Sequence, residues 1–143
     1  MSEELEYLGR AIKQAQYRQH RALETALSAV GTTVVQWDAM RAVNRMPGAS
    51  AHALAQATFQ TDQAFGTLAG RLLAQGLIER TPGTGRRIDH TLTRAGAAKL
   101  AEAEIVASRV RETLFAPLDE DERAVLRSIL DRLAGDEGVR PDD

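Results

Sequence analysis

The 143-residue chain contains no cysteine, which excludes disulfides, thiolate metal sites and thiol-based redox sensing. Aromatic residues make up only 4% of the sequence. No apolar run approaches the ~20 residues that cross a bilayer. The first residues also lack the basic and apolar segments of a signal peptide. We therefore expect a cytoplasmic protein with one domain, with or without an added arm for oligomerisation.

Charge of one sign is not in large excess, because the formal net charge is −2, but the two signs are unevenly distributed. Residues 61–99 carry six Lys and Arg against three Asp and Glu, whereas residues 116–143 carry four against nine. A mildly basic middle beside an acidic end is compatible with an anionic partner for the middle. Scattered solvated charges would explain an asymmetry of this size equally well.

Apolar residues at helical spacing predict long helices at both ends of the chain. The first seam covers about residues 3–30 and stops at Gly31, and two further seams cover about residues 95–135. Asp119 and Glu122 form a D-x-x-E capping box at the start of the last helix. A small core does not need three narrow seams, so we interpret these helices as a dimerisation part. We expect residues 136–143 to be a disordered tail.

The middle of the chain, about residues 33–94, predicts a helix, a short helix, a tight turn, a further helix and a β-hairpin. Ser50 and Thr61 are N-cap candidates for the second and third of these helices. The Gly-rich stretch TPGTGRR connects two short strands. This order is that of a winged helix-turn-helix. We predict a mainly α fold with a small β-hairpin wing (α+β), in which this part and the terminal-helix dimerisation region form a single domain.

The third helix, residues 61–75, has an unusual exposed face. Its apolar residues repeat at helical spacing from Phe65 to Leu73, which leaves short side chains on the opposite face. Two of these are glycines, Gly66 and Gly70, and each costs roughly 1 kcal/mol in a helix interior relative to alanine. A helix lying in the DNA major groove benefits from such a surface, because small residues let the backbone approach the bases. The alternative is that the glycines are tolerated or ease helix–helix packing.

Side chains that bind phosphates or bases lie on this helix and around it. On the helix, Gln63 can pair with adenine and Thr67 can contact a thymine methyl group. Arg86 and Arg87 lie at the tip of the hairpin, where a guanidinium can reach a phosphate or a minor groove, although solubility also explains surface arginines. His52, in the first turn of the short helix, can contact a phosphate.

The histidines and aromatic residues suggest little other chemistry. His20, His52 and His90 show no metal-ligand spacing, and we expect ordinary surface or boundary histidines. No nucleophile with a base, P-loop or dinucleotide fingerprint is present, so we expect no enzyme, no cofactor and no metal. One group suits a pocket for an aromatic acid, although two of its members, at helical spacing, also fit a plain core. That group is Tyr17, His20, Trp37, Met40 and Arg41.

Three segments of the chain resemble the MarR family of bacterial transcriptional regulators, in that family's order and spacing. They are TVVQWDAMRAV, LAQATFQTDQAFGTLAGRLLAQGLIER and LTRAGAAKL. The resemblance implies an obligate dimer whose first and last helices intertwine, with recognition helices in successive major grooves and wings at the flanking minor grooves. It also implies a phenolic or aromatic acid as effector, or no ligand. Many members carry an acid before the wing arginine, where this chain has Gly85, so the minor-groove arginine is either Arg86 or Arg87.

From these observations we expect a DNA-binding transcriptional regulator, a ligand-responsive repressor that binds a pseudo-palindromic operator as a homodimer through recognition helix 61–75 and wing 81–92. The alternative is a MarR-like dimer that acts as a protein–protein interaction module through its acidic tail. The resemblance assigns base reading to Thr61, Gln63, Ala64, Thr67 and Arg71. The full set of candidate DNA-binding residues is Ser50, His52, Thr61, Asp62, Gln63, Ala64, Gly66, Thr67, Arg71, Arg86 and Arg87.

Overall fold

The computed structural model of the chain describes residues 2–135 and has six helices and one two-stranded antiparallel sheet in that range. The expected mainly α fold with a β-hairpin is confirmed. The tail expected at 136–143 lies outside the described residues. The elements are α1 (Ser2–Ser28), α2 (Val34–Arg45), α3 (Ala51–Ala57), α4 (Asp62–Ala74), β1 (Ile78–Pro82), β2 (Ile88–Leu92), α5 (Arg94–Phe115) and α6 (Glu120–Ala134).

Local capping defines where most of the helices begin. In α2 to α6 the N-cap side chain accepts a hydrogen bond from the backbone N–H three residues later, which satisfies one of the free donors of the first turn. Asp119 and Glu122 complete the expected capping box. The N-caps are Thr33, Ser50, Thr61, Thr93 and Asp119. The sequence therefore encodes these helix starts within a few residues of each.

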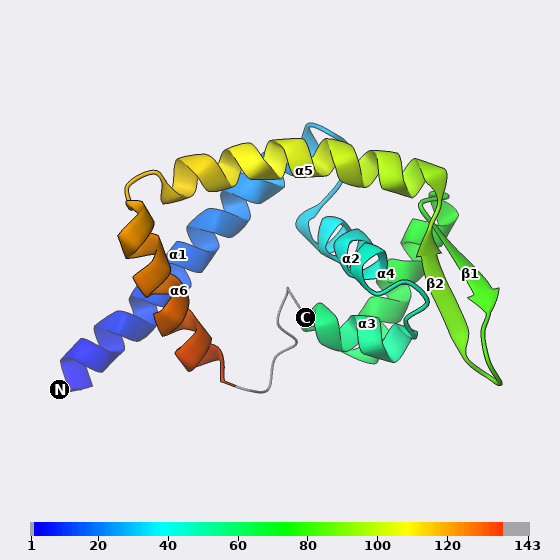
Figure 1. Cartoon of the computed structure of the whole chain (residues 1–143), viewed down its shortest axis with the longest axis horizontal. Helices are drawn as coiled ribbons and strands as arrows, with labels where there is room; N and C mark the ends of the chain where they lie inside the picture. Colours follow the sequence, from blue (N-terminus) through cyan, green and yellow to red (C-terminus); the bar gives the residue numbers. More distant parts are fainter. Residues whose placement is uncertain (1, 136–143) are drawn as a thin grey trace.

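Helices α2, α3 and α4 enclose a hydrophobic core beneath one end of α5, with the wing on their outer side (Figure 1). The expected inward stripe of α4 is buried: Phe65 and Leu72 have no exposed surface, and Leu68 is 6% exposed. Leu23 and Leu27 of α1 join the same core. The largest fully buried apolar side chains are Phe65, Leu27, Met40, Leu54, Leu72 and Val43. This packing fixes which face of α4 remains outside.

The wing and the start of α5 are held together at a close backbone approach. A Cβ atom added at Gly96 would lie 1.9 Å from the carbonyl oxygen of Leu77, so only glycine fits there. Thr93 caps α5 and also donates a hydrogen bond of 2.6 Å from its hydroxyl to the carbonyl of Gly76. The segment L-T-x-x-G therefore anchors the hairpin, whose register runs from Ile78↔Leu92 to Pro82↔Ile88.

The terminal helices leave apolar side chains uncovered within their own chain. Helix α1 packs on α5, and α6 follows a turn at the end of α5 that is distant from the wing (Figure 1). Leu5 and Ile12 of α1 are 67% and 50% exposed, and Val125 and Leu133 of α6 are 59% and 65% exposed. No residue of α6 is buried. Within residues 2–135, no helix combines the length and apolar character needed to cross a membrane.

Candidate nucleic-acid interface

The outward face of α4 is exposed and makes almost no contact with the rest of the chain. Gln63, Gly66, Thr67, Gly70 and Arg71 are all exposed, as is the neighbouring Ala64. A Cβ atom added at Gly66 or at Gly70 would meet nothing within 4 Å. The hydroxyl of Thr67 donates only to the carbonyl of Gln63 in the same helix. Packing inside this chain therefore does not require either glycine, and the helix penalty that they carry needs another explanation.

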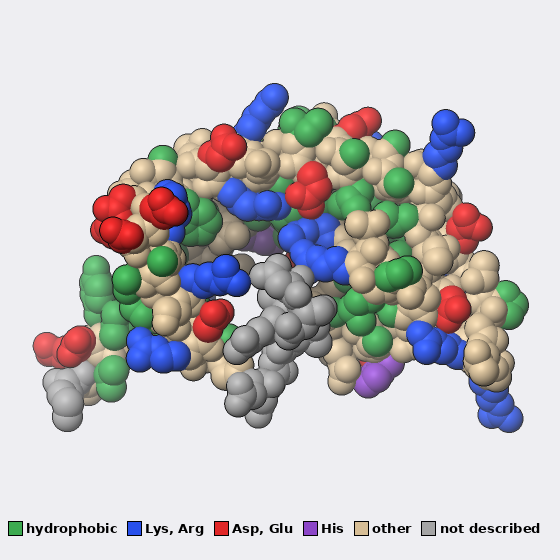
Figure 2. Space-filling view, viewed as in Figure 1, with side chains coloured by type: hydrophobic (Ala, Val, Ile, Leu, Met, Phe, Trp, Pro, Cys, Tyr) green, Lys and Arg blue, Asp and Glu red, His purple; other side chains and the backbone are tan. Residues whose placement is uncertain are grey.

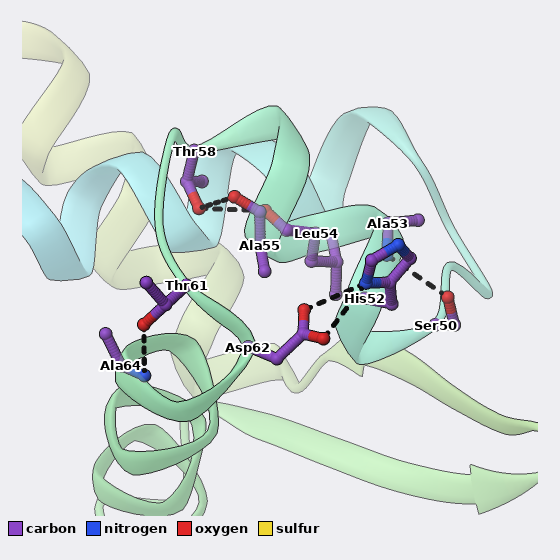
Figure 3. Close-up of polar contacts among 9 residues, drawn as sticks. All are labelled: Ser50, His52, Ala53, Leu54, Ala55, Thr58, Thr61, Asp62 and Ala64. Carbon is purple, nitrogen blue, oxygen red and sulfur yellow. Dashed lines mark hydrogen bonds and ion pairs between the residues drawn. The ribbon is translucent and has the colours of Figure 1, made fainter.

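An exposed histidine and carboxylate connect the start of α3 to the start of α4 (Figure 3). The Nδ1 atom of His52 lies 2.9 Å and 3.1 Å from the two carboxylate oxygens of Asp62. Both side chains are about two-thirds exposed. Since Asp62 is the first residue of α4, this contact places a basic group beside the one acid in that helical turn. The Nε2 atom of His52 has no partner within the described part of the chain.

The two wing arginines have different surroundings. Arg87 lies with its Nε atom 3.1 Å from Asp89, and its terminal nitrogen donates a hydrogen bond to the carbonyl of Gly48. Arg86 is exposed and has no hydrogen bond or ion pair among residues 2–135. The acid that orients an arginine is therefore Asp89, two residues after Arg87. Sequence reasoning missed it because it considered only the residue before the arginines, where Gly85 stands.

The expectation that all three histidines are surface or boundary residues is wrong for His90, which is only 2% exposed. Its Nδ1 atom lies 3.1 Å from the carbonyl oxygen of Ala49, and its Nε2 atom accepts a hydrogen bond of 3.3 Å from Arg80. Its own carbonyl accepts from the N–H of Gly48. Strand β2 packs against the α2–α3 loop, and that contact buries the ring. His90 and Arg87 thus join the wing to the loop that precedes α3. His20 is half-buried and His52 is exposed.

The five candidate effector residues lie in different environments. Met40 has no exposed surface and Trp37 is 3% exposed, so both belong to the core. Arg41 stacks on Trp37 at 4.6 Å from the ring centroid and forms an ion pair of 3.2 Å with Glu104. Tyr17 is 59% exposed on α1, and His20 is half-buried. The charge of Arg41 is therefore already paired inside the chain.

The acid next to Arg41 is also affected by its surroundings. Burial raises the pKa of Asp38 above its usual value, although Arg41, Arg45 and His20 all act to lower it. A separate cavity of about 520 Å³ lies between α1 and α5, and none of the five candidates lines it. Its apolar lining includes Ala22, Ala26, Val106 and Val110, and two arginines, Arg18 and Arg109, also border it.

Helix α3, a tight turn, helix α4 and an antiparallel hairpin in this geometry define a winged helix-turn-helix. Residues 30–88 match the family model described as "MarR family". Over this segment the chain is similar to the MarR family of transcriptional regulators. A curated relative, the HTH-type transcriptional repressor Rv2887 of Mycobacterium tuberculosis, is 28% identical over 116 residues, which cover 80% of this chain and 84% of the relative.

Two solved structures of MarR proteins superpose on nearly the whole chain. A cysteine-to-serine mutant of MarR from E. coli, complexed with operator DNA, has a TM-score of 0.84 at 25% identity and covers 91% of this chain and 95% of its own. M. tuberculosis Rv2887 in complex with salicylic acid has a TM-score of 0.71 at 26% identity and covers 88% of this chain and 95% of its own.

Proposed function

We propose that this regulator is a homodimeric repressor that binds a pseudo-palindromic operator, with α4 in the major groove and the wing at the adjacent minor groove. The observation that carries the proposal is the outward face of α4, which is exposed, built from short side chains and free of contacts at both glycines. A duplex is the partner that such a face fits, because a bare helix surface allows close approach to base edges. The protein works in the cytoplasm, where its DNA is, and catalyses no reaction.

The polar groups on and around α4 match a duplex in chemistry. Gln63 suits adenine, Thr67 suits a thymine methyl group, and Arg71 suits guanine or a phosphate. Thr61 and Ala64 lie at the same end of the helix, and Ser50 begins the neighbouring α3. His52 holds the carboxylate of Asp62 through its Nδ1 atom at the edge of this surface. A contact from the Nε2 atom of His52 to a phosphate oxygen requires a proton on that nitrogen.

Within the wing, we assign the minor-groove contact to Arg86. Arg87 already uses its guanidinium on Asp89 and on the carbonyl of Gly48, so it holds the wing in place. Arg86 has no such partner in the described chain and follows a glycine at the exposed tip. An unpaired guanidinium loses no existing contact when it enters the negative potential of a narrow minor groove.

The dimer follows from the terminal helices. Exposed leucines, isoleucine and valine on α1 and α6 form faces that a monomer would leave in water, and a second copy would cover them. Half-sites one helical turn apart, about 34 Å, then match two α4 helices related by the dimer axis. The basic wing and the acidic start of α6 lie at opposite ends of the molecule (Figure 1). At the α6 end, Figure 2 shows acidic side chains gathered over the α5–α6 turn. This separation keeps the acidic end away from the duplex.

We propose an aromatic acid as the effector. It binds more tightly to a dimer whose recognition helices are not spaced to match the two half-sites. That difference in affinity between the two dimer states releases the DNA. The relative Rv2887 has been solved with salicylic acid. Tyr17, His20 and Arg41 are the members of the candidate set with exposed surface. Arg41 would have to exchange the carboxylate of Glu104 for that of the effector.

The experiment that tests the proposal is selection of duplexes from a random library by the full chain, followed by binding measurements over a salt series. The expected result is a pseudo-palindromic consensus bound about 10³-fold or more tightly than a scrambled duplex. The protein–protein module predicts a different result, namely no enriched sequence and weak binding that disappears as salt is raised.

A further inference from the structure

The only tryptophan of the chain, Trp37 on α2, lies at a junction with α5 where three of its neighbours are charged. The guanidinium groups of Arg41 and Arg111 lie 4.6 Å and 5.4 Å from the centroid of its ring. Glu104 on α5 accepts a hydrogen bond of 3.0 Å from the Trp37 indole N–H. The same carboxylate pairs with Arg41 at 3.2 Å and with Arg111 at 3.3 Å. One carboxylate therefore receives three donors from two helices.

The cluster formed by Trp37, Arg41, Glu104 and Arg111 is partly removed from water. Its interactions are therefore screened less than those of a surface pair. Trp37 is 3% exposed, and the side chain of Glu104 is 40% exposed. Burial lowers the pKa of Arg41, with Arg45 adding to this effect, whereas Glu104 opposes it. The positive charge of Arg111 also acts to lower it. Without the negative charge of Glu104, the guanidinium groups of Arg41 and Arg111 would remain against one indole, with Asp38, 3.8 Å from Arg41, left to oppose their repulsion.

Because the cluster joins α2 to α5, a small rotation between these two helices at the cluster shifts the wing end of α5. Helix α2 belongs to the winged helix-turn-helix part, whereas α5 runs from the wing toward the terminal helices (Figure 1). Helix α5 has 22 residues, or about 33 Å at the usual rise per residue. Glu104 lies ten residues after Arg94, the first residue of α5, or about 15 Å along the helix. A rotation of about 12° at Glu104 therefore moves the wing end of α5 by about 3 Å, close to the 3.4 Å rise of one base step.

We propose that Glu104 is a positioning residue for operator recognition. It fixes α2 against α5 and thereby sets the distance between the two recognition helices of the dimer. This inference rests on the proposed function, since it needs a dimer that reads two half-sites. Glu104 touches no DNA in this account and acts only through Trp37 and Arg41.

The test compares Glu104→Gln with Glu102→Gln in the full-length dimer. Glu102 lies on the same helix and pairs only with Lys99, at 3.6 Å, with 58% of its side chain exposed. The probes are a duplex selected by the wild-type chain, the same duplex with one base pair inserted or removed between the half-sites, and a scrambled duplex. Trp37 fluorescence reports on the cluster directly, because the chain has no other tryptophan.

Glu104→Gln should shift the emission of Trp37, weaken binding to the selected duplex about tenfold, and reduce the preference for the original spacing. Its affinity for the scrambled duplex should stay unchanged, since the α4 face is intact. Glu102→Gln should match the wild type in every measurement. A Glu104→Gln dimer with wild-type affinity and wild-type spacing preference would overturn the inference.

Two further results separate the possible failures. If Glu104→Gln does not fold, Trp37→Phe, which removes the indole N–H and keeps an aromatic ring, must show the same loss of spacing preference for the inference to stand. If the wild-type chain itself selects no sequence, the proposed function fails. If the wild type binds a specific sequence and Glu104→Gln keeps the same affinity and spacing preference, only the positioning role of Glu104 is overturned and the proposed function stands.

Discussion

Helices α4 and α6 each present an exposed face, but the two faces have opposite chemistry. Helix α4 buries its apolar side chains in the hydrophobic core of its own chain and leaves glycine, threonine and glutamine exposed. Helix α6 buries nothing and leaves Val125, Ile129, Leu130 and Leu133 at least 39% exposed. An apolar face gains free energy from covering by another apolar face, whereas a short polar face fits a hydrogen-bonding partner. The difference indicates two partners, a second copy for α6 and DNA for α4.

The largest expected effect comes from placing charge on the α6 face. Val125→Asp combined with Leu133→Asp should dissociate the dimer, because four carboxylates would be buried at one interface. Operator affinity should then fall by about 10²-fold or more, since a lone protomer can hold only one half-site. Sedimentation analysis gives the mass, and Asp131→Asn, an exposed polar change on the same helix, is the control. A double variant that remains dimeric would remove α6 from the interface.

The next effect concerns the glycines of α4. Gly66→Leu should leave the fold intact, because a Cβ there meets no atom within 4 Å. It should reduce operator binding to the non-specific level, a loss of about 10³-fold or more. The matched control, Gly66→Ala, should raise the free energy of unfolding by about 1 kcal/mol. Chemical denaturation and gel shift measure the two quantities. If Gly66→Leu unfolds the chain, Gly66 is a packing residue and does not belong to a DNA-binding face.

The wing provides a smaller effect and a direct comparison of two adjacent arginines. Arg86→Ala should lower the slope of log K against log salt by about 2 per dimer, since each lost contact contributes roughly 0.9. Arg87→Ala should change the slope less, but it should increase amide exchange in the α2–α3 loop, because its hydrogen bond to Gly48 is lost. The opposite order of slopes would assign the minor groove to Arg87.

The smallest expected effect is on stability and concerns Asp38. Its pKa is raised by burial in the folded chain, so folding favours the protonated form. The contribution of protonated Asp38 to the free energy of unfolding is therefore complete only below the usual pKa of 3.8. It is lost as the pH rises through the raised pKa of the folded chain. Asp38→Asn should raise the free energy of unfolding at pH 7, measured by chemical denaturation, by less than about 1 kcal/mol because the carboxylate is 45% exposed. The difference should vanish near pH 3, and an Asn variant that is less stable at pH 7 would show that the attraction to Arg41 dominates.

The parts of this molecule that follow from local chemistry were predictable from the sequence. Ser50, Thr61 and Asp119 each cap a helix through a contact three residues away, so the signal lies within one turn. The inward stripe of α4 and the hairpin were predicted in the same way. The assignment of individual residues to base or phosphate contacts stays a prediction.

Long-range contacts were not predictable from one sequence. Glu104 reaches Trp37 across 67 positions, and no periodicity or motif connects them. His90 is buried by a loop 41 positions earlier, and a lone histidine in an alternating strand gives no sign of that. Only Asp89 carried a local signal, because an acid two residues after an arginine on a hairpin can pair with it.

If the outward face of α4 reads DNA sequence, duplex selection with variants of that face should show which base each side chain contacts. Gln63→Ala, Thr67→Ala and Arg71→Ala each truncate one side chain there. At least one variant should lose base preference at a single symmetric pair of positions and retain the rest of the consensus. A consensus unchanged at every position in all three variants would show that this face does not read sequence.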